Sequence, residues 1–136
     1  MKTCEERIDA YLDGTIADLA VLWKLHNENP QAYHPTLGNF AEYGYGFDYV
    51  EAGTFDDQPE GYFRWILSGG GPADELRFYA RQVRRGWEVS RIEYWFLDWF
   101  DGASRDVTDK PVLSEIFDWF SEVGACDNAL EQAGEV

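Results

Sequence analysis

The sequence predicts a single α+β domain in which helices at both ends pack on a four-stranded antiparallel β-meander. Two observations predict this class. Apolar residues recur at helical spacing near both ends, within 4–26 and 111–120. Between these regions, short aromatic-rich stretches are separated by glycine-rich turns, and no helical pattern intervenes.

The N-terminal helical region opens with Thr3 and Glu6, which have the spacing of a capping box. Its apolar stripe is interrupted at Asp13 and Gly14. Because Thr15 has the spacing to begin a second capping box, the pattern fits either one long helix or a pair of short helices.

Four strands are expected at 43–50, 61–67, 75–80 and 88–97. In the last of them, alternate residues point to opposite faces, and each face receives aromatic side chains. We expect one face of the sheet to pack on the helices. The other face is then covered by a loop, an oligomer partner or a bound protein.

The segment 101–110 is predicted to be a polar loop, after which Pro111 occupies the first turn of a helix. The apolar face of that helix consists of Leu113, Ile116, Phe117 and Phe120. Gly124 ends the helix, so the domain spans 1–124. The acidic remainder, 125–136, is expected to be either a frayed helix or a disordered tail.

Charge is the strongest functional indication. The chain has 26 Asp and Glu against 11 Lys and Arg, a formal net charge of −15. Solubility of a small domain needs a magnitude of only about 2 to 8. A body this negative repels nucleic acid and anionic membranes and is attracted to basic surfaces.

The region 63–91 is the exception, because it holds six arginines against three acids. These arginines either pair with the neighbouring Asp74, Glu75 and Glu88 or give the molecule a positive pole.

A cytoplasmic location is expected. No stretch approaches the roughly 18 apolar residues of a membrane span, and the N-terminus lacks the apolar core of a signal peptide. Cys4 and Cys126 lie near opposite ends and lack metal-binding spacing. They can pair only if the termini meet, so we expect two reduced thiols.

The sequence argues against an enzyme. His26 falls on the apolar stripe and is expected to be packed, while His34 lies in a proline-flanked loop. No local signature supports Cys4 as a nucleophile. The glycine run 68–72 leads into acids and a strand rather than a lysine and a helix, which favours a hairpin turn over a phosphate loop.

Two further kinds of site would involve the acids at the end of the last expected strand and after it. Asp98 and Asp101 flank two aromatic residues, as in a small carbohydrate-active domain. Together with Asp106 they lack the order of a calcium-binding loop. We therefore expect no metal and no cofactor.

Four stretches carry a resemblance: FDYVEAGTF (47–55), DQPEGYFR (57–64), LSGGGPADELRFY (67–79) and RIEYWFLDWFDG (91–102). They cover about the middle half of the chain and resemble small acidic proteins encoded by bacteria, plasmids and phages. That group includes antirestriction and anti-CRISPR inhibitors, several of which mimic DNA. The resemblance implies an inhibitor of the same kind, without a functional motif matched residue by residue.

We therefore expect a non-enzymatic inhibitor that blocks a basic nucleic-acid-binding complex, such as a CRISPR surveillance complex or a restriction enzyme. Duplex DNA carries one charge per about 1.7 Å of axis. Across the roughly 37 Å diameter of a compact chain of this length, it presents roughly 20 charges, which is comparable to −15. The alternatives are an adaptor module whose acidity serves solubility, and the carbohydrate-active domain.

The candidate partner-binding residues come from the 55–60 loop and from the end of the last expected strand onward. They are Asp56, Asp57, Glu60, Trp95, Asp98, Trp99, Phe100, Asp101, Asp106 and Asp109. The three aromatic residues among them either form a desolvated hot spot at the interface or belong to the core. Neither nucleic acid nor a membrane is expected to bind directly.

Overall fold

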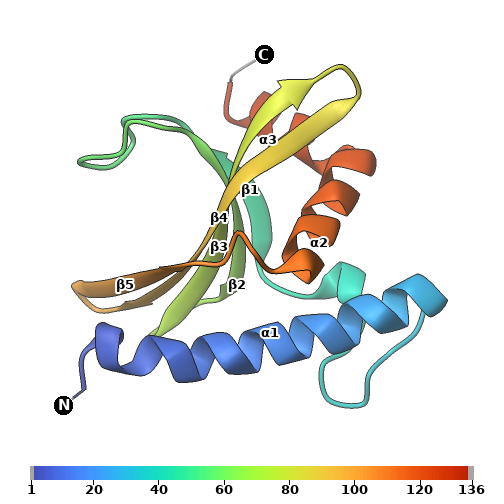
Figure 1. The fold of residues 1–136 in the computed structure, drawn as a ribbon, viewed down its shortest axis with the longest axis horizontal. Helices are drawn as coiled ribbons and strands as arrows, with labels where there is room; N and C mark the ends of the chain where they lie inside the picture. Colours follow the sequence, from blue (N-terminus) through green and yellow to red (C-terminus); the bar gives the residue numbers. More distant parts are fainter. Residues whose placement is uncertain (1, 135–136) are drawn as a thin grey trace.

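The computed structural model describes residues 2–134 and confirms the α+β class. Its five strands form one antiparallel sheet in which each strand pairs with its neighbour in sequence (Figure 1). The strands are β1 (Gly46–Val50), β2 (Tyr62–Ser68), β3 (Ala73–Val83), β4 (Gly86–Asp98) and β5 (Asp101–Asp106). The expected meander is therefore present, with one strand more than the four expected.

Within residues 2–134, three α-helices lie on one face of the sheet (Figure 1). They are α1 (Cys4–Glu28), α2 (Pro111–Glu122) and α3 (Ala125–Gln132), and a short 3₁₀ helix, η1 (Phe40–Glu42), precedes β1. Helix α1 contacts β4 and β5, α2 contacts β4, and α3 contacts β1. On the other side of the sheet, the β1–β2 loop and the β4–β5 hairpin both project away from α2 and α3.

The prediction of four strands was wrong at β5, which occupies the segment expected to be a polar loop. The sequence DGASRD holds no β-branched or large apolar residue, so its local preference for a strand is low. Pairing with β4 supplies what local preference lacks: Ala103 lies opposite Phe96, and Arg105 lies opposite Tyr94. On the helix-facing side, Arg105 forms ion pairs with Glu5 and Asp9 of α1.

Helix α1 is continuous, so the alternative of two short helices is wrong. The capping box of Thr3 and Glu6 is confirmed by reciprocal hydrogen bonds. Gly14 lies on the exposed side, with no atom placed to contact an added Cβ within 4 Å. Thr15 does not cap a second helix, because its hydroxyl donates to Asp74 of β3. This hydrogen bond therefore joins the helix to the sheet next to Gly14, the residue with the lowest helix propensity in α1.

The C-terminal region forms two helices. Pro111 occupies the first turn of α2, and the predicted apolar face is buried. Gly124 separates α2 from α3 with a φ of 84°, the left-handed conformation that glycine adopts readily. The segment that was expected to be frayed or disordered forms α3 as far as Gln132, with Cys126 and Ala129 buried. The remainder of that expectation, residues 135 and 136, lies outside the described residues.

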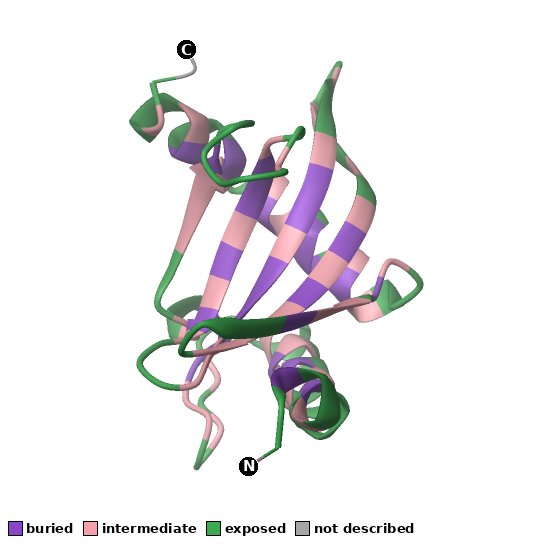
Figure 2. Ribbon diagram, turned by 90° about the vertical axis from the view of Figure 1, so that its left-hand side faces the viewer, coloured by how far each residue is buried: buried purple, intermediate pink, exposed green. Residues whose placement is uncertain are grey.

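The main core fills the space between the helices and the sheet. Along the strands, buried residues alternate with partly exposed ones (Figure 2), as expected for a sheet that is covered on one face. A smaller apolar cluster of Val50, Tyr62 and Tyr79 lies on the other face. That second cluster shows that the face opposite the helices is not simply a solvated surface.

Candidate functional site

The sheet face turned away from the helices, called the open face below, carries a row of charged side chains across all five strands. The register aligns Asp48, Arg64, Arg77, Glu93 and Asp106 in that order. Arg64 and Asp48 form an ion pair at 2.7 Å. The arrangement places two guanidiniums in the centre of the face and carboxylates at both edges.

The central arginine of this row stacks on aromatic rings. The guanidinium carbon of Arg77 lies 3.9 Å from the ring centre of Trp95 and 4.8 Å from that of Tyr62. Its Nε pairs with the buried carboxylate of Glu75 at 2.8 Å. A guanidinium held by stacking and by an ion pair has little freedom to reorient. Arg77 therefore forms a fixed part of the floor of the open face.

Arg91 is held in the same way. Its guanidinium lies 3.8 Å from the ring centre of Tyr79, and it pairs with Glu60 at 3.2 Å and with Glu93 at 3.4 Å. Because Glu60 belongs to the β1–β2 loop, this ion pair ties the loop to the floor. The Nε1 of Trp95 also donates to Glu93.

The β1–β2 loop, residues 51–61, lies over this floor, and the two border an open cavity of about 430 Å³. The loop side of the cavity consists of Phe55, Asp56, Asp57, Gln58, Pro59 and Glu60, and the floor side consists of Arg77, Tyr79, Arg91, Glu93 and Trp95. Four candidate residues therefore lie together. Within the described part of the chain, Asp56 and Asp57 form no ion pair, so their charges face solvent uncompensated.

The β4–β5 hairpin presents the other aromatic candidates at its tip. Trp99 is 91 % exposed and Phe100 is fully exposed, so neither belongs to the core. Trp99 has a φ of 57°, a backbone conformation that is uncommon for a bulky residue. Together the two rings form an exposed apolar projection.

Asp98 and Asp101 flank this tip and fasten it to α1. Asp98 pairs with Arg7 at 2.6 Å, and an Asp101 oxygen accepts a hydrogen bond from the backbone N–H of Cys4 at 2.7 Å. The second contact holds the pKa of Asp101 below its usual range. These carboxylates brace the hairpin, and the charge of Asp98 is largely compensated.

The last two candidates lie at and beyond the end of β5. Hydrogen bonds from Thr108 hold the pKa of Asp106 below its usual range. Asp106 aligns with the charged row of the open face. Asp109 is exposed but lies just before α2, where the chain passes to the helix-covered side. Asp106 is therefore part of the open face, and Asp109 lies at its margin.

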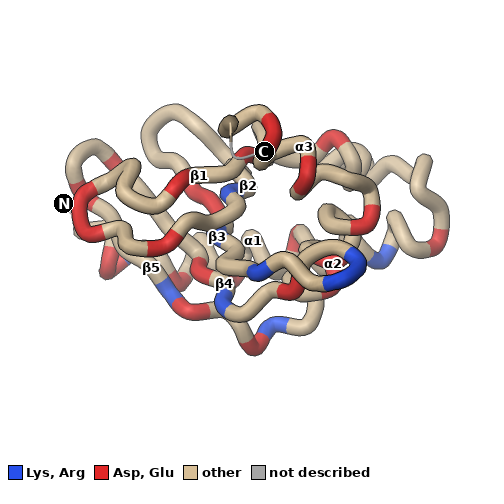
Figure 3. The backbone as a smooth tube through the Cα atoms, turned by 90° about the horizontal axis from the view of Figure 1, so that it is seen from above, with Lys and Arg blue, Asp and Glu red and all other residues tan. Residues whose placement is uncertain are grey.

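Ion pairing neutralises only a minority of the carboxylates. Among residues 2–134, eight carboxylates pair with six arginines: Arg7, Arg64, Arg77, Arg81, Arg91 and Arg105. Of the two alternatives for the arginine-rich region, pairing is confirmed for Arg77 with Glu75 and for Arg81 with Glu88. Asp74 instead accepts hydrogen bonds from hydroxyl groups. Acidic positions lie on several sides of the backbone (Figure 3).

The histidines and cysteines considered for catalysis make packing or hydrogen-bond contacts within the fold. His26 packs between Trp23, Phe40 and Trp119. His34 accepts two backbone hydrogen bonds within its own loop. Both cysteines are buried free thiols, and no group of three or more His, Cys, Asp or Glu within residues 2–134 is arranged to hold a metal ion.

A second acidic surface was missed by the sequence interpretation. Glu115, Asp118 and Glu122 recur on one face of α2, beside Trp23 and His26 of α1, where they line a groove of about 300 Å³. The spacing of these acids is visible in the sequence. It was not recognised because an acidic stripe on an amphipathic helix is ordinarily a solvated face.

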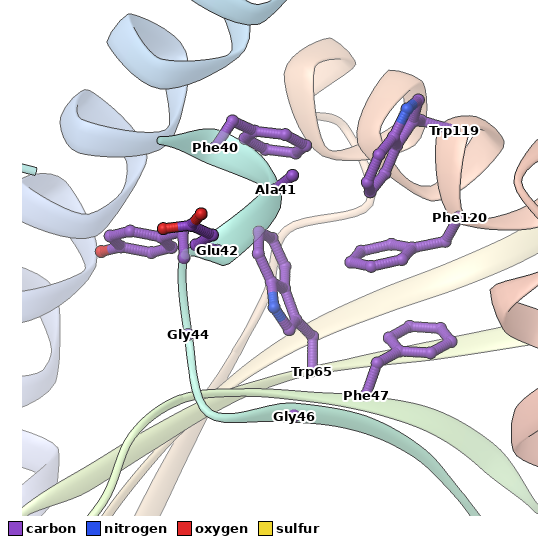
Figure 4. Close-up of a pocket in the computed structure, with 10 residues that line it drawn as sticks. Phe40, Ala41, Glu42, Gly44, Gly46, Phe47, Trp65, Trp119 and Phe120 are labelled. Carbon is purple, nitrogen blue, oxygen red and sulfur yellow. The ribbon is translucent and has the colours of Figure 1, made fainter. Parts of the chain in front are cut away.

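An aromatic pocket of about 190 Å³ adjoins this groove at Trp119 (Figure 4). Its lining includes Phe40, Phe47, Trp65, Trp119 and Phe120, contributed by η1, β1, β2 and α2. The backbone approaches closely at Gly44, where an added Cβ would lie 2.8 Å from Nε1 of Trp65. The pocket therefore extends the aromatic packing that supports the groove.

Comparisons with known proteins identified no relative. No protein-family model matches the chain, and neither the curated proteins nor the solved structures contain a significant match. Within residues 2–134, no helix combines the length and apolar character needed to span a membrane.

Proposed function

We propose that this protein is a non-enzymatic inhibitor of a nucleic-acid-binding defence complex, of the anti-CRISPR or antirestriction type. One observation carries the proposal: the β1–β2 loop and the β4–β5 hairpin project from the same side of the sheet. The unpaired acids of the loop, Asp56 and Asp57, and the exposed rings of the hairpin tip are therefore available to one partner. The arms act together with the floor between them.

The charge of this surface suits a basic partner. The open face and its arms hold ten carboxylates: Asp48, Glu51, Asp56, Asp57, Glu60, Glu75, Glu93, Asp98, Asp101 and Asp106. Four arginines and Lys2 oppose them, and each of the arginines already pairs with a carboxylate. The excess negative charge would accelerate encounter with a basic channel and make binding sensitive to salt.

The hairpin tip supplies the apolar part of the interface. Aromatic residues, Trp above all, are enriched among interface hot spots, and truncation of one hot-spot residue costs about 2 kcal/mol or more of binding free energy. The ion pair of Asp98 with Arg7 holds the base of the tip in place. Burial of Trp99 and Phe100 against a partner would therefore require little ordering of the backbone.

A second candidate function is a general adaptor module whose acidity keeps it soluble. The spread of acidic positions over several sides of the molecule favours it (Figure 3), because a DNA mimic needs its charge concentrated where the partner binds. The two functions differ in whether the partner's bound surface is the one that normally holds nucleic acid.

Competition with DNA separates these two functions. The protein is immobilised and exposed to lysate from cells that carry restriction and CRISPR systems, and bound proteins are eluted with duplex oligonucleotide or with salt. The proposal expects a nucleic-acid-binding complex that both treatments release. A partner that duplex DNA does not displace would instead support the adaptor function.

Paired variants locate the interface in the same experiment. Replacement of Trp99 and Phe100 by serine removes the exposed rings without opening the core, so capture should fall at least about 30-fold while the fold persists. The double variant Asp56→Asn/Asp57→Asn should weaken capture more at low salt than at high salt. Unchanged capture by both variants would contradict the proposed interface.

A further inference from the structure

The groove between the C-terminal half of α1 and helix α2 combines an aromatic floor with an acidic rim. It has a volume of about 300 Å³. Its lining residues are Trp23, His26, Asn27, Glu115, Asp118, Trp119 and Glu122. It lies on the helical side of the molecule and shares no residue with the cavity of the open face.

The floor is rigid because its rings pack on one another. Trp23 and His26 stack at 5.5 Å with an interplanar angle of 15°, and Trp119 meets the imidazole edge-on at 5.3 Å. Phe40 supports all three rings from η1, with centroid distances of 5.0 to 5.2 Å. Trp23, His26 and Trp119 are each only partly buried and line the groove, so a cation bound there would lie beside preorganised aromatic rings.

The rim concentrates negative charge that no ion pair among the described residues neutralises. Glu115, Asp118 and Glu122 form no ion pair with any residue of the described range 2–134. Glu115 is oriented by a hydrogen bond from the indole Nε1 of Trp23 at 3.1 Å. Partial burial, followed by repulsion from Glu122 and Glu115, raises the pKa of Asp118.

The position of these acids in α2 adds to the repulsion. The C-terminal end of a helix carries a partial negative charge and favours cations. The last turn of α2 contains Glu122 and no basic residue. The fold therefore tolerates an electrostatic cost that an arriving positive charge would relieve.

We propose that this groove binds an arginine side chain of a protein partner. A guanidinium can stack on the indole faces while its N–H groups donate to two carboxylates at once, which a lysine ammonium cannot do with the same geometry. The inference rests on the proposed function in one respect, namely that the partner is basic. It adds a second contact, on a face different from the one assigned to the arms.

The groove can be tested with a capped Gly-Arg-Gly peptide, which requires no knowledge of the partner. The indole N–H signals of Trp23 and Trp119 are followed by NMR as peptide is added, after assignment with Trp→Phe variants. We expect saturable shifts of these two signals and weaker binding of the matching Gly-Lys-Gly peptide. Absence of a saturable shift, or equal binding of both peptides, would overturn the proposal.

Charge-matched variants provide the control. The double variant Asp118→Asn/Glu122→Gln should weaken peptide binding at least about tenfold, because it removes the rim charge and leaves the Glu115–Trp23 hydrogen bond in place. The variant Asp56→Asn/Asp57→Asn makes the same change in charge on the open face and should bind the peptide normally. Equal loss in both would show a general charge effect and overturn the inference.

The peptide titration and the DNA-competition experiment fail independently. If duplex DNA releases no captured complex but the arginine peptide still binds, the function assigned to the open face is refuted and the groove assignment stands. The reverse result would refute the groove alone.

Discussion

Two tyrosines allow the same chemical change to be made in opposite surroundings. Tyr94 and Tyr62 are both fully buried, each with 0 % exposure. The hydroxyl of Tyr94 donates to the carboxylate of Asp74. The hydroxyl of Tyr62 has no hydrogen-bond partner within the described residues 2–134. Replacement by phenylalanine should therefore destabilise the protein at the first position and not at the second.

The expected changes in stability follow from whether each tyrosine hydroxyl has a hydrogen-bond partner. Hydrogen bonds to charged groups contribute about 1.5–3 kcal/mol, so Tyr94→Phe should lower the free energy of unfolding by that amount. Asp74 would retain its hydrogen bonds from Ser68 and Thr15. Tyr62→Phe loses no hydrogen bond and removes an unsatisfied buried hydroxyl, so it should be neutral or stabilising. For a chain of this length, the first change corresponds to a fall in Tm of roughly 5–15 °C.

The pH dependence gives a second measurement. Burial, reinforced by the hydrogen bond to Asp74, raises the pKa of Tyr94 above its usual range. Because the folded state holds this proton more tightly than the unfolded state, the contribution is complete below about pH 10 and declines as pH rises. The decline approaches about 1.4 kcal/mol per pH unit from this group. Tyr94→Phe should make the alkaline loss of stability less steep.

Urea denaturation at pH 7 and between pH 9 and 11, followed by tryptophan fluorescence and circular dichroism, measures both effects. Burial raises the pKa of Tyr62 as well, so both variants should show a shallower alkaline decline. The contrast at neutral pH is therefore the deciding result. Equal destabilisation by the two variants, or a larger loss in Tyr62→Phe, would refute the reasoning.

Two further predictions concern the buried thiols and one hairpin glycine. Burial raises the pKa of Cys126 to about 12 and also raises that of Cys4, so Ellman's reagent should label both thiols only after unfolding; rapid labelling of folded protein would contradict this. Gly86 has a φ of 102°, and an added Cβ would lie 2.4 Å from Oγ of Ser121. Gly86→Ala should therefore lower the free energy of unfolding by about 1–3 kcal/mol. Gly69→Ala is the control, because no atom lies within 4 Å of an added Cβ there, and it should change the free energy of unfolding little. A similar loss in both variants would contradict this explanation.

The parts of the fold that sequence reasoning predicted correctly depend on local signals. The capping box of Thr3 and Glu6 and the buried stripe of α2 each involve residues within one or a few helical turns. Strand β5 depends instead on pairing with β4, and its own residues carry no strand signal. The continuity of α1 through Gly14 is likewise supported by tertiary contacts, because core residues lie on both sides of Gly14 and Thr15 donates a hydrogen bond to Asp74 of β3.

In the candidate site, too, the sequence predicted the features that depend on composition and missed those that depend on tertiary contacts. Charge composition predicted an acidic surface, but strand alternation alone did not show where β4 would end and release Trp99 and Phe100 to solvent. Nor did the sequence show that Arg7 and the backbone of Cys4 would engage Asp98 and Asp101, because those contacts join positions 91 and 97 residues apart. Which carboxylates are compensated is therefore a property of the tertiary structure.

The attachment of α1 to β4 and β5 has a consequence for synthesis on the ribosome. The contacts that anchor the first turn of the helix require residues made more than 90 positions later. At about 5–20 residues per second, the ribosome needs roughly 5–20 s to make them. Throughout that interval the apolar stripe of the nascent helix lacks the surface that covers it in the finished protein. Helix α1 is made before these residues and cannot dock in full until the sheet has been completed.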